Sequence, residues 1–252
     1  MISIIMFSDK SAGQVRGGWE ESGRMYRPFE EFRVTGKCVS VIGSGGKTTL
    51  LRILSARLPG SVILTTSTHI FPFPDVPLVD TGNENTPANR ERILSEIRAA
   101  LSRGRIVCLG QLLPSGKLAS PAPFLPFEEL LPVADHLLVE ADGAKGLPLK
   151  AHRPWEPVIP ACSDLTVCVA GASGIGRPAS LACHCPDLFC AMAGTKPDQP
   201  VEPEHVAAVL NRENLADCYL VNQADTLPYP ETARRLCALI AKDAFPCSLS
   251  PR

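Results

Sequence analysis

A short apolar run, a glycine-rich segment and a helical pattern follow one another in the first quarter of the chain, and no other feature constrains the fold as much. Residues Cys38–Ile42 are a short run typical of a β-strand. The segment Gly43–Thr49 comes next, and from Thr48 to Leu58 leucines recur at helical spacing. The glycines therefore lie between the end of a strand and the start of a helix.

The same alternation of strand-like and helix-like segments continues along the chain. Further strands are expected at residues 61–65, 105–110, 136–141, 165–170 and 218–221, and helices at 87–102, 126–131, 203–211 and 230–242. This order predicts an α/β fold, in which a mostly parallel sheet is flanked by helices in a three-layer sandwich like that of P-loop NTPases. In such sheets ligands bind at the carboxyl ends of the strands.

Composition limits the class of protein. Of the 252 residues 45% are apolar and 20% are charged, which is enough apolar material for a core. The net charge of −1 leaves no basic excess for a phosphate backbone, so we expect no nucleic-acid partner. Residues 1–33 show little periodicity and are expected to be a variable or disordered extension, with residues 34–252 forming one domain.

The ten cysteines are scattered from Cys38 to Cys247, and a chain of this length does not need them as a disulfide framework. The sequence shows neither a secretory signal nor a stretch suited to span a membrane. We therefore expect reduced thiols, a cytoplasmic protein and no membrane partner.

The glycine-rich segment has the composition of a phosphate-binding loop. Its members are Gly43, Ser44, Gly45, Gly46, Lys47, Thr48 and Thr49. Glycines let backbone N–H groups turn towards phosphate oxygens, and the helix start adds partial positive charge. Lys47 is expected to reach the β- and γ-phosphates and Thr48 to ligate Mg²⁺. The loop is a shortened variant, because Val41 stands where the usual spacing has a glycine.

Two acidic residues follow a second buried strand. Glu140 and Asp142 end the apolar run that begins at His136, and residues two apart in a strand point to the same face. Together with Lys47 they are the expected catalytic residues, and together with Thr48 the expected Mg²⁺ ligands. A solvated turn with two acids is the alternative.

The segment from Asn222 to Asp225 resembles the Asn-Lys-x-Asp loop that reads guanine, with Gln223 in place of the lysine. Asn222 and Asp225 are therefore candidate base-binding residues. Asn-x-x-Asp is also an ordinary turn composition, so the choice between ATP and GTP stays open.

Two other segments each allow two interpretations. Thr65–His69 offers hydroxyls and an imidazole for phosphate binding or proton transfer, or is a β-branched strand end with a surface histidine. Cys183-His184-Cys185 with Cys190 offers soft ligands, but its spacing fits no usual zinc pattern, and Leu181–Ala193 also reads as a cysteine-rich helix.

Four blocks of the chain resemble the YqeC family, which is described as accessory to selenium-dependent hydroxylases. These blocks are Val41–Leu51, Thr65–Pro72, Glu140–Gly146 and Leu147–Pro154, and the likeness runs from about residue 35 to 245. The resemblance implies a P-loop nucleotide-binding domain that helps a molybdenum hydroxylase to mature, with selenium handling as one route.

The last two blocks also contain Lys145, Lys150, His152 and Arg153. These cations beside the acidic pair are expected either to bind a second anion or to be solvated loop charges.

The first functional hypothesis is a Mg²⁺-dependent NTPase that acts on a molybdenum hydroxylase or its cofactor. The second is a carrier without turnover that holds a pterin dinucleotide cofactor, and the third is a small-molecule kinase or ATP-dependent ligase. The expected cofactors are Mg²⁺ and ATP or GTP.

Overall fold

The computed structural model describes residues 37–225 and 229–249, so the expected extension at residues 1–33 lies outside it. The strands are β1 Cys38–Gly43, β2 Val62–Thr66, β3 His69–Ile70, β4 Leu78–Asp80, β5 Ile106–Leu112, β6 Leu118–Ala119, β7 His136–Glu140, β8 Leu149–Lys150, β9 Leu165–Gly171, β10 Cys183–His184, β11 Cys218–Asn222 and β12 Ala244–Pro246. The helices are α1 Lys47–Arg57, α2 Pro87–Arg103, α3 Ala179–Ala182, α4 Pro186–Ala193, α5 Pro203–Glu213 and α6 Tyr229–Leu239, with 3₁₀ turns at Phe127–Glu129 and Ala172–Gly174.

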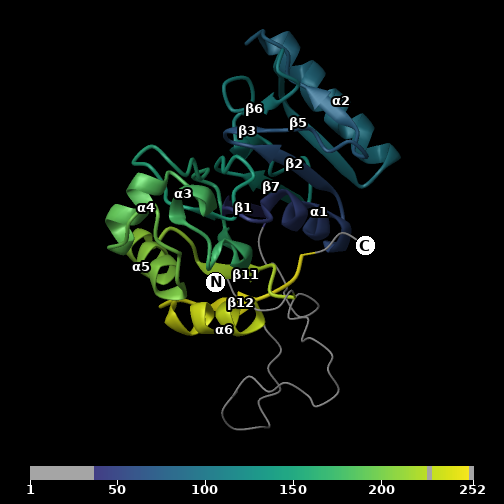
Figure 1. Ribbon diagram of the computed structural model, residues 1–252. Coiled ribbons are helices and arrows are strands. Elements are labelled where there is room, and N and C mark those ends of the chain that lie inside the picture. The colour runs from purple at the N-terminus through teal and green to yellow at the C-terminus, as the bar shows by residue number, and fades with distance from the viewer. Residues whose placement is uncertain (1–36, 226–228, 250–252) are drawn as a thin grey trace, which may run out of the picture.

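One large sheet dominates the molecule, in the order β12-β11-β9-β1-β7-β2-β5-β6-β3. Neighbours from β12 to β5 are parallel, whereas β6 pairs antiparallel with both β5 and β3. β4 adds a parallel edge to β5, and β8 pairs with β10 in a separate two-stranded sheet. The predicted α/β class with a mostly parallel sheet is confirmed (Figure 1).

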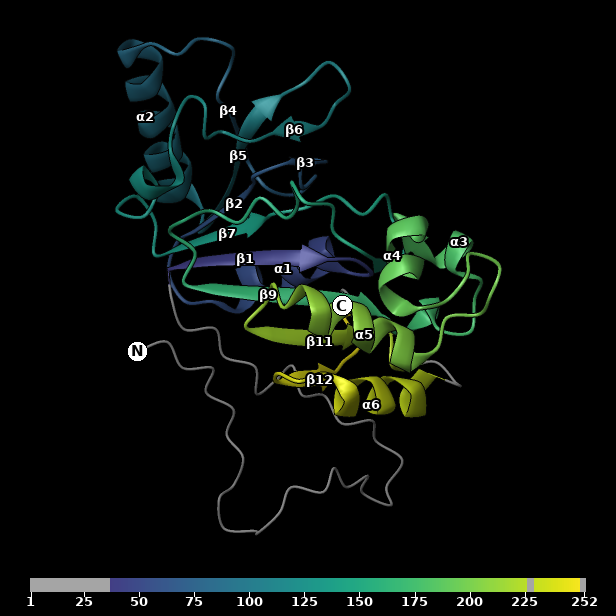
Figure 2. The ribbon, with the colours of Figure 1, turned by 90° about the vertical axis from the view of Figure 1, so that its left-hand side faces the viewer.

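Helices cover both faces of this sheet, as a sheet of buried parallel strands requires. Val39 and Val41 of β1 pack with the leucines of α1 in one cluster. On the opposite face Cys38 belongs to the cluster that contains α2, and Ile42 to the cluster that contains α5 and α6. Figure 2 shows α5 in front of β9 and β11, which together with α1 behind gives the predicted three layers.

The expected strands and main helices are present, but the shortest elements were not anticipated. A strand of two or three residues has no periodicity, so β3, β4, β6, β8, β10 and β12 left no local signal. The expected helix at 126–131 is a 3₁₀ turn. The helical interpretation of Leu181–Ala193 is correct for Pro186–Ala193 but not as one helix, because Cys185 adopts a left-handed conformation (φ 61°) that separates α3 and β10 from α4.

No helix in the described part of the chain combines the length and apolar character needed to cross a bilayer.

Candidate functional site

The expected site residues converge at one edge of the sheet. β1, β2, β7, β9 and β11 run parallel, so their carboxyl ends lie together. The glycine loop, Gly43–Thr49, leaves β1 at this edge, and Glu140 is the last residue of β7. Figure 2 shows the arrowheads of β1 and β9 pointing to the same side, where α4 lies.

The glycine loop is packed too closely for side chains at its glycines. Gly43 has φ 88°, and a Cβ there would lie 2.2 Å from the carbonyl oxygen of Val169. Gly46 has φ 140°, and a Cβ there would lie 2.4 Å from Nδ2 of Asn222. Only glycine combines these positive φ angles with such close approach. The loop is therefore fixed against β9 and β11 before any ligand binds.

Lys47 is buried and faces both acids. Its Nζ donates to the carbonyl oxygen of Gly43 at 2.7 Å and lies 3.1 Å from Oδ1 of Asp142 and 3.7 Å from Oε1 of Glu140. The structure thus brings together the three residues that the sequence nominated as catalytic.

Asp142 is fully buried and surrounded by donors. Its Oδ2 accepts from the backbone N–H of Gly43 at 2.8 Å and contacts Nε2 of His152 at 2.7 Å and Nζ of Lys150 at 3.2 Å. Burial would raise the pKa of Asp142, but the hydrogen bond from His152 and the charges of Lys47 and Lys150 outweigh burial and lower it to about 2. Asp142 is a firmly ionised counter-ion that ties the glycine loop to the cations around it.

Glu140 has a different environment. Thr48 Oγ1 donates to its Oε2 at 3.1 Å, and Lys47 is its nearest cation. Burial raises the pKa of Glu140 and outweighs the effects of Lys47 and Thr48. Of the two acids, Glu140 is the one whose carboxylate has fewer partners and takes up a proton more readily.

His152 joins the site to helix α5. Its Nε2 contacts Asp142, and its Nδ1 lies 2.8 Å from Oε2 of Glu213 at the end of α5. The backbone N–H of His152 also donates to Oε1 of Glu213 at 2.6 Å. Burial lowers the pKa of His152, but the two carboxylates outweigh burial and raise it. Both ring nitrogens face carboxylates, which favours the protonated imidazole.

Lys150 is also neutralised by carboxylates. Its Nζ donates to the carbonyl oxygen of Gly143 at 2.6 Å and lies 2.7 Å from Oε2 of Glu156 in addition to its contact with Asp142. Lys150 and His152 are therefore not solvated loop charges, and carboxylates already occupy the positions in which a second anion would pair with them. Lys145 and Arg153, from the same group of four cations, are exposed.

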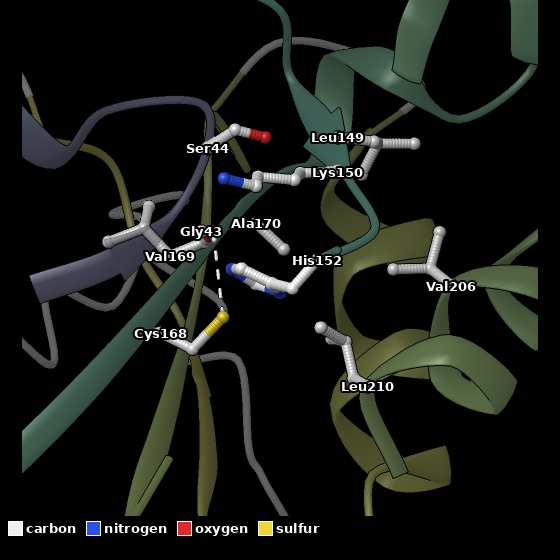
Figure 3. A pocket seen from close by; sticks show the side chains of 10 residues that line it. All are labelled: Gly43, Ser44, Leu149, Lys150, His152, Cys168, Val169, Ala170, Val206 and Leu210. Carbon is white, nitrogen blue, oxygen red and sulfur yellow. Dashed lines mark hydrogen bonds between the residues drawn. The ribbon is translucent and has the colours of Figure 1, made fainter. Parts of the chain in front are cut away.

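A small cavity lies behind the glycine loop (Figure 3). Lys150 and His152 point from one side towards Gly43, with Val206 and Leu210 of α5 opposite. Its volume is about 10 Å³, roughly the room that one water needs. The buried hydroxyl of Ser44, another lining residue, has no hydrogen-bond partner among the described residues. This cavity holds at most a water molecule and is no substrate pocket.

The expected base-reading residues take separate positions. Asn222 is buried, and its Nδ2 donates to the carbonyl oxygen of Gly45 at 2.7 Å while its Oδ1 accepts from the N–H of Leu249 at 2.8 Å. Gln223, at φ 65°, accepts from the hydroxyl of Ser173. Asp225 is exposed. Asn222 therefore supports the glycine loop, and Asp225 is the one of the pair whose side chain faces solvent.

The polar segment after β2 is fastened to β7. Thr66 Oγ1 donates to the carbonyl oxygen of Glu140 at 2.8 Å, and the N–H of Ser67 donates to the same oxygen at 3.1 Å. Thr65 is buried and donates to Leu109, Thr68 donates its N–H to Thr66, and His69 is exposed on β3. Thr66 and Ser67 thus hold Glu140 in place through its backbone.

The cysteine-rich segment is not a preformed metal centre. Across residues 37–225 and 229–249, no three histidine, cysteine or acidic side chains form a group that could hold a metal ion. Cys183, Cys185 and Cys190 are buried, and burial raises the pKa of Cys183 to about 12. Their surroundings suit small packing side chains.

Sequence reasoning missed Glu156 and Glu213. Glu213 lies 61 residues from His152, and nothing in either local sequence links the two. The only available signal was the pair of basic residues itself, since buried cations need carboxylate partners.

The family model described as YqeC protein matches residues 39–187. A protein of Escherichia coli (strain K12), named "Uncharacterized protein YqeC", is 32% identical over 180 residues, which is 68% of this chain and 66% of that relative's own length. No solved structure matches the chain.

Proposed function

Because this chain belongs to the YqeC family, we propose that it binds a magnesium nucleoside triphosphate at the glycine loop and cleaves its terminal phosphate bond during maturation of a molybdenum hydroxylase. The observation that carries the proposal is the position of Lys47, buried between a rigid glycine loop and two carboxylates at the carboxyl edge of a parallel sheet. The role of the hydroxylase as client is supported by the family resemblance.

The loop supplies the elements that a triphosphate needs. Gly46 starts α1 without a side-chain cap, so the first N–H groups of α1 have no side-chain acceptor at that position. Lys47 adds a positive charge, and the β- and γ-phosphates would attract its ammonium group away from Asp142. Asp142 would keep His152 and Lys150 as its remaining partners.

The oxygen ligands fit Mg²⁺ in kind and number. Mg²⁺ is usually held in such sites by one or two protein oxygens, with water and phosphate completing the octahedron. Thr48 Oγ1 and Glu140 Oε2 lie 3.1 Å apart and would hold the ion between them. Mg²⁺ bound there would neutralise charge that develops on the phosphates. Asp142, whose Oδ2 already contacts Gly43, His152 and Lys150, is better suited to balance charge than to ligate the ion directly.

Glu140 is also the better candidate to orient the nucleophile. Its pKa is raised, and Thr66 and Ser67 fix its backbone, so its carboxylate can accept a proton from an attacking hydroxyl at a defined position. The sequence offers no difference between the two acids, whereas their surroundings support proton transfer at Glu140 and charge balance at Asp142.

The test is phosphate release by the purified full chain with Mg²⁺ and either ATP or GTP. Glu140→Gln is expected to bind nucleotide and lose turnover, because the amide keeps the shape and cannot accept the proton. Binding without release in the wild type would favour the carrier of a pterin dinucleotide, and absence of binding would reject the proposal.

The nucleotide base is proposed to be read at Asp225. Its exposed carboxylate has two acceptor oxygens for the two donors of guanine, which predicts tighter binding of GTP than ATP. Competition between GTP and ATP for wild type and Asp225→Asn tests this. Equal affinities in the wild type would reduce the segment 222–225 to a support for the glycine loop.

Phosphoryl transfer to an acceptor is a second candidate activity. It is favoured by the exposed cations Lys145 and Arg153 beside the site, which hydrolysis does not require.

A further inference from the structure

The chain that follows Asp142 crosses over the glycine loop. The carbonyl oxygen of Pro148 accepts from the N–H of Gly171 at 2.8 Å and lies 2.9 Å from where a Cβ on Gly45 would be. Residues 143–148 therefore run from the end of β7 to the end of β9. Lys145 is exposed within this crossing and adopts φ 49°, which is uncommon for a residue with a side chain.

A second segment lies against the same edge. The N–H of Val158 donates to the carbonyl oxygen of Ala141 at 2.9 Å, and Glu156 is paired with Lys150 beside Asp142. This segment carries Trp155, which is 67% exposed, with the guanidinium of Arg153 5.6 Å from its ring centroid. An aromatic ring and a cation are thus held in a stacked arrangement at the border of the site.

His184 adds a third basic side chain. It lies on β10 in register with Lys150 of β8 and is half-buried. Burial and the charges of Lys150, Lys145 and Arg153 lower the pKa of His184 and outweigh the carboxylate of Glu156, which raises it, so these cations and Glu156 lie near His184. Within the described ranges neither Lys145 nor Arg153 forms an ion pair with a carboxylate.

We propose that Lys145, Arg153, Trp155 and His184, here called the rim cluster, bind a second ligand, an anionic group carried on a planar heteroaromatic ring. The ring stacks on Trp155 and Arg153, and the phosphate or carboxylate of the ligand lies among the cations. Its place as second substrate rests on the proposed function, since the neighbouring glycine loop then holds the nucleotide.

The composition of the rim cluster selects this ligand class. A small inorganic anion would need the cations and leave the exposed ring of Trp155 uncovered. A neutral aromatic molecule would leave the cations without a partner. A nucleic-acid strand would need a longer basic surface than a chain with net charge −1 supplies. The existing stack of Arg153 on Trp155 reduces the ordering that binding requires.

The probe is flavin mononucleotide, which combines a planar ring with a phosphate, titrated into the full chain without nucleotide. Quenching of flavin fluorescence reports binding, and a Trp19→Phe background leaves Trp155 as the one tryptophan reporter. Riboflavin, which lacks the phosphate, and inorganic phosphate, which lacks the ring, are expected to bind at least about tenfold more weakly.

Trp155→Ala and the double variant Lys145→Ala, Arg153→Ala are each expected to weaken flavin mononucleotide binding about tenfold or more. The matched control is another aromatic–cation pair, the exposed Phe71 with the half-buried Lys117, whose Nζ lies 5.2 Å from the ring centroid. Phe71→Ala and Lys117→Ala should leave the affinity unchanged. Equal affinity in rim and control variants, or absence of binding, would overturn the inference.

Lys47→Met separates this site from the nucleotide site. It should lower nucleotide affinity by a factor of about 100 and leave flavin mononucleotide binding intact. Loss of both would place the probe in the glycine loop and overturn the inference. If the wild type binds the probe through the rim cluster but binds no nucleoside triphosphate, the proposed function fails and the rim site stands.

Discussion

Two groups of cations from neighbouring stretches of chain behave in opposite ways. Lys150 and His152 are buried, and both contact Asp142 as well as a second carboxylate. Lys145 and Arg153, at most a few residues away, are exposed and lack carboxylate partners in the part of the chain that the structure describes. A buried charge needs a partner, whereas an exposed one is solvated until a ligand arrives.

The comparison separates cations that hold the site together through ion pairs from cations that are available to bind a ligand. Lys150 and His152, here called the inner group, fix the glycine loop, the end of β7 and the end of α5 relative to one another through Asp142. Lys145 and Arg153, the two exposed cations of the rim cluster, contribute nothing to that framework and are available for binding. Four predictions can break or sharpen this distinction.

Asp142→Ala should have the largest effect. It leaves Lys47, Lys150 and His152 without their shared carboxylate, and breaking a buried pair of this kind costs about 3–5 kcal/mol. Urea unfolding measures the loss. Asp75→Ala is the matched control, because the Asp75 carboxyl is 81% exposed in its ion pair with Arg52. A loss of unfolding free energy no larger than that of the control would show that the contacts of the inner group with Asp142 do not stabilise the fold.

Lys47→Met should lower nucleotide affinity by a factor of about 100, or about 2.7 kcal/mol, because it removes a charge-assisted contact to phosphate. Isothermal titration with ATP and GTP measures it. Lys117→Met, a charge removed from the β5–β6 hairpin, is the control. Unchanged affinity would mean that the loop does not bind phosphate. The burial of Lys47 between two acids also predicts a lower melting temperature for this variant.

The third prediction concerns pH. The folded pKa of His152 is raised above the ordinary value of 6.5, so its stabilising charge is fully present below about pH 6.5 and is lost as pH rises through the folded value. Without metal or nucleotide, the free energy of unfolding should fall over this range by up to about 1.4 kcal/mol per pH unit. The slope should be shallower in His152→Gln. Identical slopes in both proteins would show that His152 is not a buried cation.

The smallest effect is expected at the rim. Lys145→Ala and Arg153→Ala should each change the free energy of unfolding by no more than about 0.5 kcal/mol, because exposed side chains without partners contribute little to folding. Urea unfolding measures these changes. Lys150→Ala, measured in the same way, should lose far more of its free energy of unfolding. A rim variant as unstable as Lys150→Ala would erase the distinction between the two groups.

The fold was largely predictable because its central strands are buried on both faces. β1, β7, β9 and β11 are apolar runs that composition alone marks as strands, and their alternation with helices indicates parallel pairing. β8 and β10 could not be predicted, since two residues acquire strand character only when the chain brings them together.

The site was predictable where strand ends supply it and unpredictable where distant residues complete it. Lys47, Glu140 and Asp142 meet because parallel strands end at one edge. The partners of Lys150 and His152 come from the next loop and from α5, so formal charge in the sequence suggested either anion binding or solvation where the folded chain forms ion pairs. Burial, which decides between these outcomes, is a property of the folded chain.

Two of the side-chain hydrogen bonds of Asn222 have a genetic consequence. One reaches the glycine loop at Gly45 and the other reaches Leu249, while β12 is anchored separately by Cys247 on Val221. A nonsense allele that ends the chain after Ser248 would keep β12 yet leave Oδ1 of Asn222 without its N–H donor. Such an allele should resemble a glycine-loop missense allele in its phenotype, with normal protein abundance, and should fail to complement one.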